Sequence, residues 1–354
     1  MSDDEDAERP SIITPWCRNG NLTAWFMPHV LKHNGERNLD LSRLKHVVRY
    51  AKSLHPDFFE SPTIGFCAFR CVQMSYRDVI VCLVQEGISP NLLFRGRTML
   101  HEAVRISNEA MVRFLLTLPG INKNAYDDDS KTAVMYAVKG KPQCLKILLE
   151  AGCDISLVDR NGKTAFHVAI NAPQAHPRDI TACLNLLWMQ GANINQRGAH
   201  GKTCLQRAIE SNMQWLLAWL IVHNCDLNSP INNKRVKTFY SHEKQKCYNF
   251  SSPFLLACQM KNRKIVEVLI SVGCKFRPHI WLLEYTRPVL YLHESLSNAF
   301  QQVTTLRLLC RKVLRDCLST DIVAESCQLG LPEPLRCFLL CHDELNALGI
   351  LPVG

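Results

Sequence analysis

A single pattern recurs about every 33 residues along most of this 354-residue chain. Each copy opens with a short apolar helix-like segment and closes with a second apolar stretch that ends in glycine or asparagine. The closing residues stand at positions 87, 120, 152, 191, 224 and 273, which are separated by 33, 32, 39, 33 and 49 positions. Six registrations of one pattern predict a stack of similar helical units, because no single unit can bury its apolar face alone.

The start of each unit carries the clearest motif. Its copies read TMLHEA at 98–103, TAVMYA at 132–137, TAFHVA at 164–169, TCLQRA at 203–208 and SPFLLA at 252–257. The first threonine or serine predicts a helix N-cap, and the alanine is small enough for neighbouring helices to approach closely. Glycine or asparagine after the second helix predicts a left-handed turn. The pattern resembles the ankyrin repeat, so we predict an all-α ankyrin-repeat solenoid of about six repeats, two of them with insertions.

The order of segments along the chain follows from this pattern. We expect a disordered acidic tail over 1–20, which begins MSDDED, and a helical N-terminal cap over 21–64, with one helix across 40–54. The repeats occupy 65–284, and a linker helix follows over 285–300. A separate three-helix module is expected over 301–345, and the last residues, 346–354, form a tail.

Composition narrows the class of protein. Hydrophobic residues make up 47% and charged residues 21% of the chain, which is typical of a folded domain. The longest apolar run, residues 215–222, is too short to cross a bilayer. The seventeen cysteines include no CxxC pair, and no secretory signal is evident, so we expect reduced thiols in the cytoplasm or nucleus and no structural metal or cofactor.

No enzyme active site is evident. The GKT triplets at 162–164 and 201–203 look like the end of a phosphate-binding loop, but Leu157 and Gln196 stand where that loop needs a glycine. His101 and His167 occupy a fixed repeat position, where a structural hydrogen bond is expected. We therefore predict a non-catalytic binding protein.

Two insertions interrupt the repeats. The smaller covers 172–179 and contains two prolines, and the larger covers 229–250. The larger one interleaves aromatic residues with the basic residues Lys234, Arg235, Lys237, Lys244 and Lys246. Such a segment can contact an acidic protein surface or a nucleic acid, or it can be a solvated loop. Our hypothesis is that it contributes to partner recognition; with a net charge of only +9, nucleic acid is not the expected partner.

The C-terminal segment has its own helical pattern. Leu306, Leu309, Cys310, Val313 and Leu314 are spaced to form one apolar stripe of a helix. A second helical stretch covers 322–329, and proline at 334 can begin a third helix. Three short helices make too small a core by themselves, so this module is expected to complete its burial against a partner.

This module resembles a SOCS box, and together with the repeats it makes the chain similar to the ankyrin-repeat and SOCS-box family. Thr305, Leu306, Cys310 and Leu314 match that family's motif for binding elongin B and elongin C. Its cullin-5 motif, Leu-Pro-apolar-Pro, is matched by Leu331, Pro332 and Pro334, while Glu333 departs from it. The resemblance implies a substrate-recognition subunit of a cullin-5-type RING ubiquitin ligase, with Leu306 filling an apolar pocket of elongin C.

Two other functions remain open. The C-terminal helices could instead cap the last repeat of a plain interaction scaffold, and the basic 229–250 segment could bind a polyanion. For target binding, the candidates lie on turns and first helices of the repeats and in the larger insertion; they are Arg95, Arg97, Tyr126, Arg160, His200, Lys234, Arg235 and Lys237.

The hypothesis about the larger insertion can be tested by deletion. Removing residues 231–247 should weaken binding to a target protein, because it removes most of the basic and aromatic residues of the insertion, while the repeats on either side are kept. Binding of the intact and shortened chains to the same immobilised target provides the measurement. Equal binding would remove this segment from the recognition surface.

Overall fold

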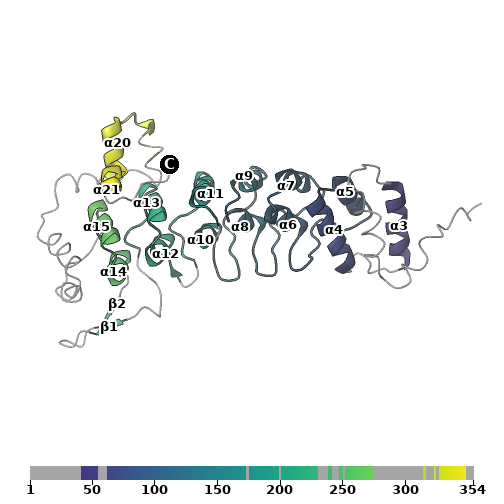
Figure 1. Ribbon diagram of the computed structural model, residues 1–354, viewed down its shortest axis with the longest axis horizontal. Coiled ribbons are helices and arrows are strands. Elements are labelled where there is room, and N and C mark those ends of the chain that lie inside the picture. Colours follow the sequence, from purple (N-terminus) through teal and green to yellow (C-terminus); the bar gives the residue numbers. More distant parts are fainter. Residues whose placement is uncertain are drawn as a thin grey trace, which may run out of the picture. The chain divides into compact units, whose positions relative to one another are not determined.

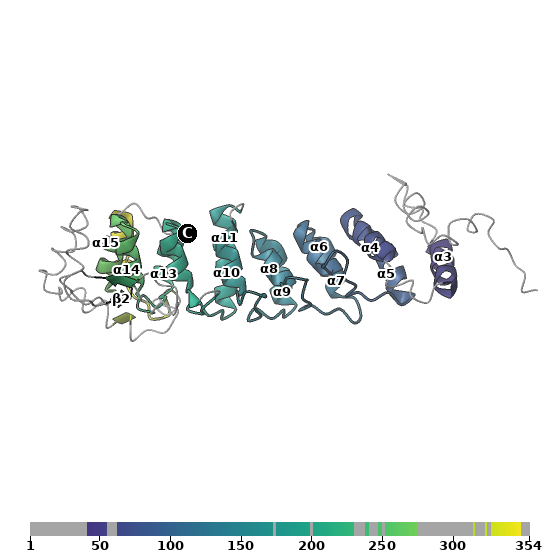
Figure 2. The same ribbon diagram turned by 90° about the horizontal axis from the view of Figure 1, so that it is seen from below.

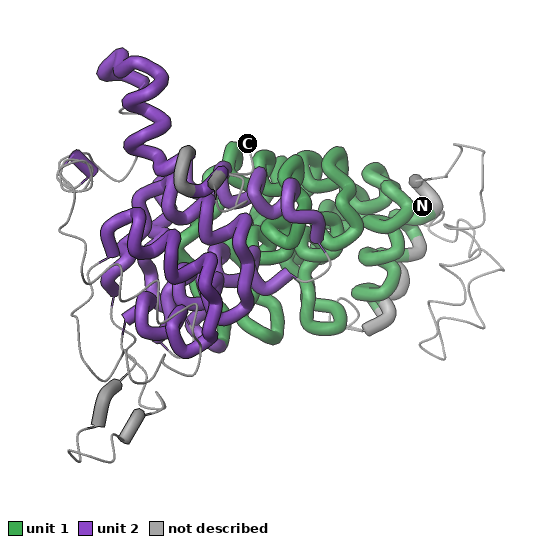
Figure 3. Tube along the Cα trace, turned by 60° about the vertical axis from the view of Figure 1, so that its left-hand side comes forward, with its two compact units in different colours: residues 1–160 green, residues 161–354 purple. Residues whose placement is uncertain are grey.

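The structure is a computed structural model. It describes residues 41–54, 62–172, 175–198, 201–229, 238–240, 247–249, 252–274, 314–315, 323 and 327–347. The chain divides into two compact units, unit 1 over 1–160 and unit 2 over 161–354 (Figure 3). Both units are mostly helical, and each is considered by itself below.

Unit 1 consists of antiparallel helix pairs stacked side by side (Figure 1). Its first helix, α3 (Leu41–Leu54), coincides with the helix predicted over 40–54 and packs on α5. In the inner row of helices α4 contacts α6, and α6 contacts α8; in the outer row α7 contacts α9. The remaining bounds are α4 (Pro62–Met74), α5 (Arg77–Gln85), α6 (Met99–Arg105), α7 (Glu109–Leu116), α8 (Ala133–Ala137) and α9 (Pro142–Glu150).

Unit 2 repeats the same arrangement. The inner helices α10, α12 and α14 contact one another in that order, and each pairs with the helix that follows it (Figure 2). A C-terminal pair, α20 and α21, lies after the repeats, and α21 contacts α15. The bounds are α10 (Ala165–Ile170), α11 (Pro177–Met189), α12 (Cys204–Glu210), α13 (Gln214–Val222), α14 (Pro253–Gln259), α15 (Arg263–Val272), α20 (Glu333–Leu339) and α21 (His342–Ala347).

The larger insertion contains a short antiparallel hairpin of β1 (Thr238–Tyr240) and β2 (Cys247–Asn249). Residue 238 pairs with 249, and residue 240 pairs with 247. The helical repeat pattern did not signal these strands. The two strands do contain three aromatic residues, Phe239, Tyr240 and Tyr248, and one threonine, residue types that favour extended backbone.

The predicted left-handed turns are confirmed at all six closing positions. The φ angles are +107° at residue 87, +75° at 120, +71° at 152, +78° at 191, +55° at 224 and +94° at 273. Five of these residues are glycines, and the sixth is Asn224. Residues with a Cβ rarely adopt this region, so the spacing of these turn residues records the period of the stack.

All five predicted N-cap residues stand at the start of a helix, and three of them make the capping hydrogen bond. The Thr98, Thr203 and Ser252 side chains each accept a hydrogen bond from the backbone N–H three residues on. Thr132 and Thr164 also stand at N-cap positions, but their side chains make no capping bond. The alanine at the end of each motif is fully buried in every copy, at 103, 137, 169, 208 and 257.

A buried side chain links each of two first helices to the turn that follows it in the chain. The ring of His101 contacts the Thr98 hydroxyl at 2.8 Å through Nδ1, and Nε2 lies 3.0 Å from the carbonyl oxygen of Lys131. Gln206 occupies the same motif position in unit 2, where its amide donates to the Ser229 carbonyl at 3.0 Å. The histidine therefore has a structural role that an uncharged amide can also perform.

Protonation of His101 should destabilise the fold. Burial lowers the pKa of His101, although the hydrogen bond to the Lys131 carbonyl acts in the opposite direction. The unfolded chain then binds the proton more tightly, so this residue's contribution to stability is present above about pH 6.5 and is lost as the pH falls below it. We expect His101→Gln to stay within about 1 kcal/mol of the wild type at pH 7.5 and to lose less stability at pH 5.

Urea unfolding followed by circular dichroism at the two pH values checks this prediction. His101→Ala is the control, because it removes both hydrogen bonds. It should cost about 1–3 kcal/mol at pH 7.5 and less at pH 5, where the wild type has lost the contribution of the neutral imidazole. An identical loss of stability on acidification in the wild type and in His101→Gln would contradict it.

Candidate functional site

The described residues contain no arrangement suited to metal binding or to crossing a membrane. No three or more of their histidine, cysteine, aspartate and glutamate side chains cluster as metal ligands would. None of their helices is long and apolar enough to span a bilayer. Most of their cysteines are buried, and burial raises the pKa of the Cys204 and Cys225 thiols to about 12, so neither thiol is a nucleophile at neutral pH.

The candidate target-binding residues of unit 1 lie on the turns between repeats. Arg95 and Arg97 flank Gly96 in the first turn, where Phe94 and Arg97 form an isolated bridge. Tyr126 is exposed at the start of the second turn, and Arg160 at the end of unit 1 donates to the Asp128 carbonyl. The structure thus places the first three on surfaces that a partner can reach, while Arg160 is already bonded to the neighbouring turn.

Several predicted site residues lie outside the described residues. They are His200, Lys234, Arg235 and Lys237 among the target-binding candidates, and Thr305, Leu306 and Cys310 in the elongin motif.

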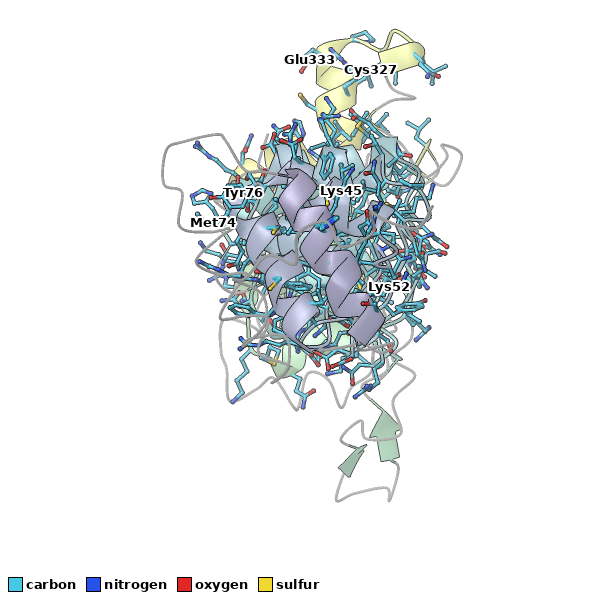
Figure 4. The ribbon with its side chains drawn as sticks, turned by 90° about the vertical axis from the view of Figure 1, so that its right-hand side faces the viewer. Lys45, Lys52, Met74, Tyr76, Cys327 and Glu333 are labelled. Atoms are coloured by element: carbon cyan, nitrogen blue, oxygen red, sulfur yellow. The ribbon has the colours of Figure 1, made fainter. Side chains whose placement is uncertain are left out.

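The part of the C-terminal module that is described begins helix α20 where the sequence predicts it. Pro332 is the N-cap, with φ −54° and ψ +147°, and Pro334 lies in the first turn of the helix. Leu331 is half-buried, while Pro332 and Pro334 are exposed. Figures 1 and 4 show that α20, with Glu333 and Cys327 near its start, extends away from the stacked helices of unit 2.

Arg315 anchors this module to the repeats. Its side chain is 6% exposed, and its Nη2 donates to the carbonyl of Ile221 at 2.5 Å, near the end of α13. Nη1 donates to the carbonyl of Leu339 at 2.9 Å, near the end of α20. One guanidinium therefore joins two helix ends whose last carbonyl groups have no partner within their own helices. Sequence reasoning missed this residue, because an arginine beside an apolar stripe is ordinarily exposed.

Leucine side chains around this anchor remain open to solvent. Leu314, next to Arg315, is 43% exposed, and Leu329 and Leu335 are 63% and 46% exposed. In contrast, Leu339, Leu340 and Leu345 are buried. The described part of the module thus buries one apolar face and leaves Leu314, Leu329 and Leu335 on its surface.

Comparison with known families identifies the repeats. Residues 68–159 match the model for ankyrin repeats in three copies, so the predicted repeat type is confirmed there. The crystal structure of the ankyrin repeat domain of Bcl-3, a member of the IkappaB protein family, matches with a TM-score of 0.52 and 22% identity. That match covers 65% of this chain and 97% of the Bcl-3 domain, and it shows that the two share a fold. This fold is typically a non-catalytic interaction module.

Relatives of known name match over parts of the chain. Human ankyrin repeat and SOCS box protein 16 is 30% identical over 38% of this chain and 28% of its own length. The E3 ubiquitin-protein ligase KEG of Arabidopsis thaliana is 29% identical over 36% of this chain and 8% of its own length. The B-cell lymphoma 3 protein homolog of Mus musculus is 26% identical over 49% of this chain and 42% of its own length. The chain thus spans less than half the length of each of these relatives.

Replacing the anchor should release the C-terminal helices. In Arg315→Met the apolar stem is kept but the Ile221 and Leu339 carbonyls lose a charged donor, at about 1.5–3 kcal/mol for each such hydrogen bond. We expect the amides of α20 and α21 to exchange with deuterium at least tenfold faster, while those of α12 and α13 keep their protection.

Arg336→Met is the matched control, because that half-buried guanidinium belongs to the same module and bonds within it, to exposed Glu333 and to exposed Cys327. A surface ion pair contributes at most about 1 kcal/mol, so exchange should change little. Equal exchange in Arg315→Met and the wild type would show that the anchor does not hold the module.

Proposed function

We propose that this chain is the target-recognition subunit of a cullin-RING ubiquitin ligase. The ankyrin repeats hold the target protein, and the C-terminal module binds elongin B and elongin C and recruits cullin-5 with its RING subunit. The chain itself supplies no catalytic residue. An E2 enzyme bound to the RING subunit transfers ubiquitin, and the chain acts by bringing the target close to it.

The observation that carries this proposal is the combination of a fixed module and exposed leucines. The buried Arg315 ties the module to α13, so anything bound to the module is held at a defined position relative to the repeats of unit 2. At the same time Leu314, the last residue of the elongin motif, keeps 43% of its surface exposed beside this anchor. A plain capping helix would be expected to bury this leucine against its own repeats.

In this proposal the elongin contact is a helix in a groove. Leu306 fills an apolar pocket of elongin C, Cys310 lies one turn further on and is small enough for close contact, and Leu314 extends the same apolar stripe. Thr305 begins the motif. The affinity for elongin C then depends on the apolar surface area that the contact buries, and not on a charge.

The cullin contact rests on Leu331, Pro332 and Pro334. Both prolines are exposed at the start of α20, where a partner can reach them. Glu333 stands where the motif has an apolar residue, and its carboxylate pairs with Arg336 one helical turn later. That pairing reduces the cost of covering the carboxylate, so the departure from the motif is compatible with a cullin contact of lower affinity.

The names of two relatives support the proposed role in a ubiquitin ligase. The first name joins ankyrin repeats to a SOCS box, and the second is that of an E3 ubiquitin-protein ligase. The compartment that follows from the proposed assembly is the cytoplasm or the nucleus.

Replacement of the motif residues should abolish elongin binding. In Leu306→Asp/Cys310→Asp two carboxylates would have to enter an apolar groove, and we expect affinity for purified elongin B/C to fall at least a hundredfold. Isothermal titration with the full chain provides the measurement. Leu93→Asp is the control. Leu93 is 53% exposed and lies in unit 1, so the affinity of this variant for elongin B/C should equal that of the wild type.

The cullin contact can be separated from the elongin contact. Pro332→Ala/Pro334→Ala should weaken recruitment of cullin-5 to the elongin-bound chain and leave elongin binding unchanged. If wild-type protein does not bind elongin C at all, the proposal is wrong. The chain would then be an ankyrin scaffold whose C-terminal helices serve as a cap.

A further inference from the structure

A cleft with an aromatic wall lies on unit 1, between α4, the turn at 94–97 and α6. The Phe94 ring stands edge-on to the rings of Phe66 and Phe69, with centroid distances of 6.0 Å and 5.2 Å. Gly65 in α4 makes this packing possible, because a Cβ there would come within 2.9 Å of Phe94 Cδ2. The volume of about 320 Å³ is at the lower end of the range for ligand-binding clefts, roughly 300–1,000 Å³.

Positive charge surrounds the aromatic wall. Four arginines line the cleft, and one carboxylate, that of Glu102, lies among them. The four come from three separate elements, α4, the 94–97 turn and α6, and they are Arg70, Arg95, Arg97 and Arg105.

The Glu102 carboxylate is committed to structural contacts. It is 2% exposed and accepts two hydrogen bonds from Arg105, both at 2.8 Å, and one from the Gln73 amide at 2.8 Å. The bonds from Arg105 are the main reason that the pKa of Glu102 lies below its usual value, so the carboxylate is ionised at neutral pH. Glu102 therefore pairs directly with Arg105 and attracts Arg97 more weakly, while the Asp128 carboxylate lies against Gly96, between Arg95 and Arg97.

The other three arginines form no ion pair with a carboxylate of the described residues. Arg70 donates to the uncharged side chain of Gln73 at 2.8 Å, and Arg97 interacts with the Tyr136 hydroxyl. Arg95 lies over the face of the Phe94 ring at 5.4 Å from its centroid, and its φ of +49° places it in the left-handed region. Within the same described residues, the Nε atoms of Arg70 and Arg97 are buried without a hydrogen-bond partner.

We propose that this cleft binds a short acidic segment of the target protein, with aspartate or glutamate side chains on the arginines and an aromatic side chain against the Phe94 wall. Guanidinium groups bind carboxylates through pairs of parallel hydrogen bonds. A phenyl wall favours an aromatic neighbour through edge-to-face contact. The inference deepens the proposed function, because it rests on the role of the repeats in target binding and names the chemistry that they recognise.

The surroundings of the cleft favour a short peptide over a nucleic acid. The next turn carries Asp127, Asp128 and Asp129 in a row, and the Asp128 amide donates to the Gly96 carbonyl at 3.0 Å, so this acidic turn lies beside the cleft. A long polyanion that ran along successive turns would meet these carboxylates. A segment whose charges stay within the cleft would not.

Fluorescence anisotropy with the full chain can test the proposal. The probe is a fluorescein-labelled peptide in which a run of aspartate and glutamate is flanked by phenylalanine, and the reference peptide carries asparagine and glutamine in place of the acids. We expect the acidic probe to bind at least tenfold more tightly than its amide counterpart, and its affinity to fall with added salt. Arg70→Gln and Arg95→Gln should each weaken it about tenfold.

Arg113→Gln is the matched control. Arg113 belongs to the same unit and is well exposed on α7, but it pairs with Glu150 at 3.3 Å, away from the cleft, and its loss changes the net charge by the same amount. Circular dichroism of each variant verifies that it is folded. Equal weakening by Arg113→Gln, or equal affinity for the acidic and amide peptides, would overturn the proposal. Probe binding that appears only after residues 1–9 are deleted would overturn it in favour of the chain's own acidic residues as the occupant.

Elongin binding, measured on the same samples, separates this inference from the proposed function. Arg70→Gln and Arg95→Gln leave the C-terminal module untouched, so they should keep wild-type affinity for elongin B/C. A chain that binds the acidic probe but not elongin C would retain the cleft inference and reject the ligase. The reverse result would retain the ligase and reject the cleft.

Discussion

The fold depends on buried polar side chains that reach from one repeat to the backbone of the next. His101 and Gln206 do this at the same motif position, and each reaches the carbonyl of a turn that lies later in the chain. Asn91 adds a further link, since it donates to the Gly120 carbonyl at 2.8 Å and accepts from the Asn122 amide at 2.7 Å. Because buried backbone groups must be paired, the repeats that these side chains join complete their hydrogen bonding only when the neighbouring repeat is folded.

The parts of the fold that the sequence predicted are those set by the local geometry of the backbone. The turn residues, the N-caps and the inward alanines are fixed by local geometry, and local geometry restricts which residue can stand at a position. Asn224 shows the logic well, because it replaces glycine at a turn yet still adopts a φ of +55°. The helix over 40–54 and the start of α20 near Pro334 follow from equally local signals, namely apolar spacing and proline placement.

Features that depend on contacts between distant residues could not be predicted. Arg315 bonds with Ile221, which lies 94 positions earlier, and nothing local distinguishes it from the arginines at 307 and 311. Gly65 is a second case. Glycine weakens a helix, and it is needed at this position of α4 because a Cβ would collide with the Phe94 ring from a later turn. Of the candidate site, the sequence singled out Arg95 and Arg97, but it gave no sign that Arg70, Phe66 and Phe69 join them, because those three come from helix α4.

The hydrogen bonds of Arg315 differ from those of the cleft arginines. Arg315 is buried, and its guanidinium finds carbonyl, sulfur and amide acceptors within the chain, so its role is complete without a partner. Arg70, Arg95 and Arg97 contact an amide, a ring face and a phenol, none of which carries the opposite charge. Carboxylates of Glu102 and of the 127–129 turn lie near these guanidinium groups, but none of the described carboxylates forms an ion pair with Arg70, Arg95 or Arg97. Each of these three guanidinium groups can therefore still form a paired hydrogen bond with a carboxylate of a partner, which is what a binding site for an acidic segment requires.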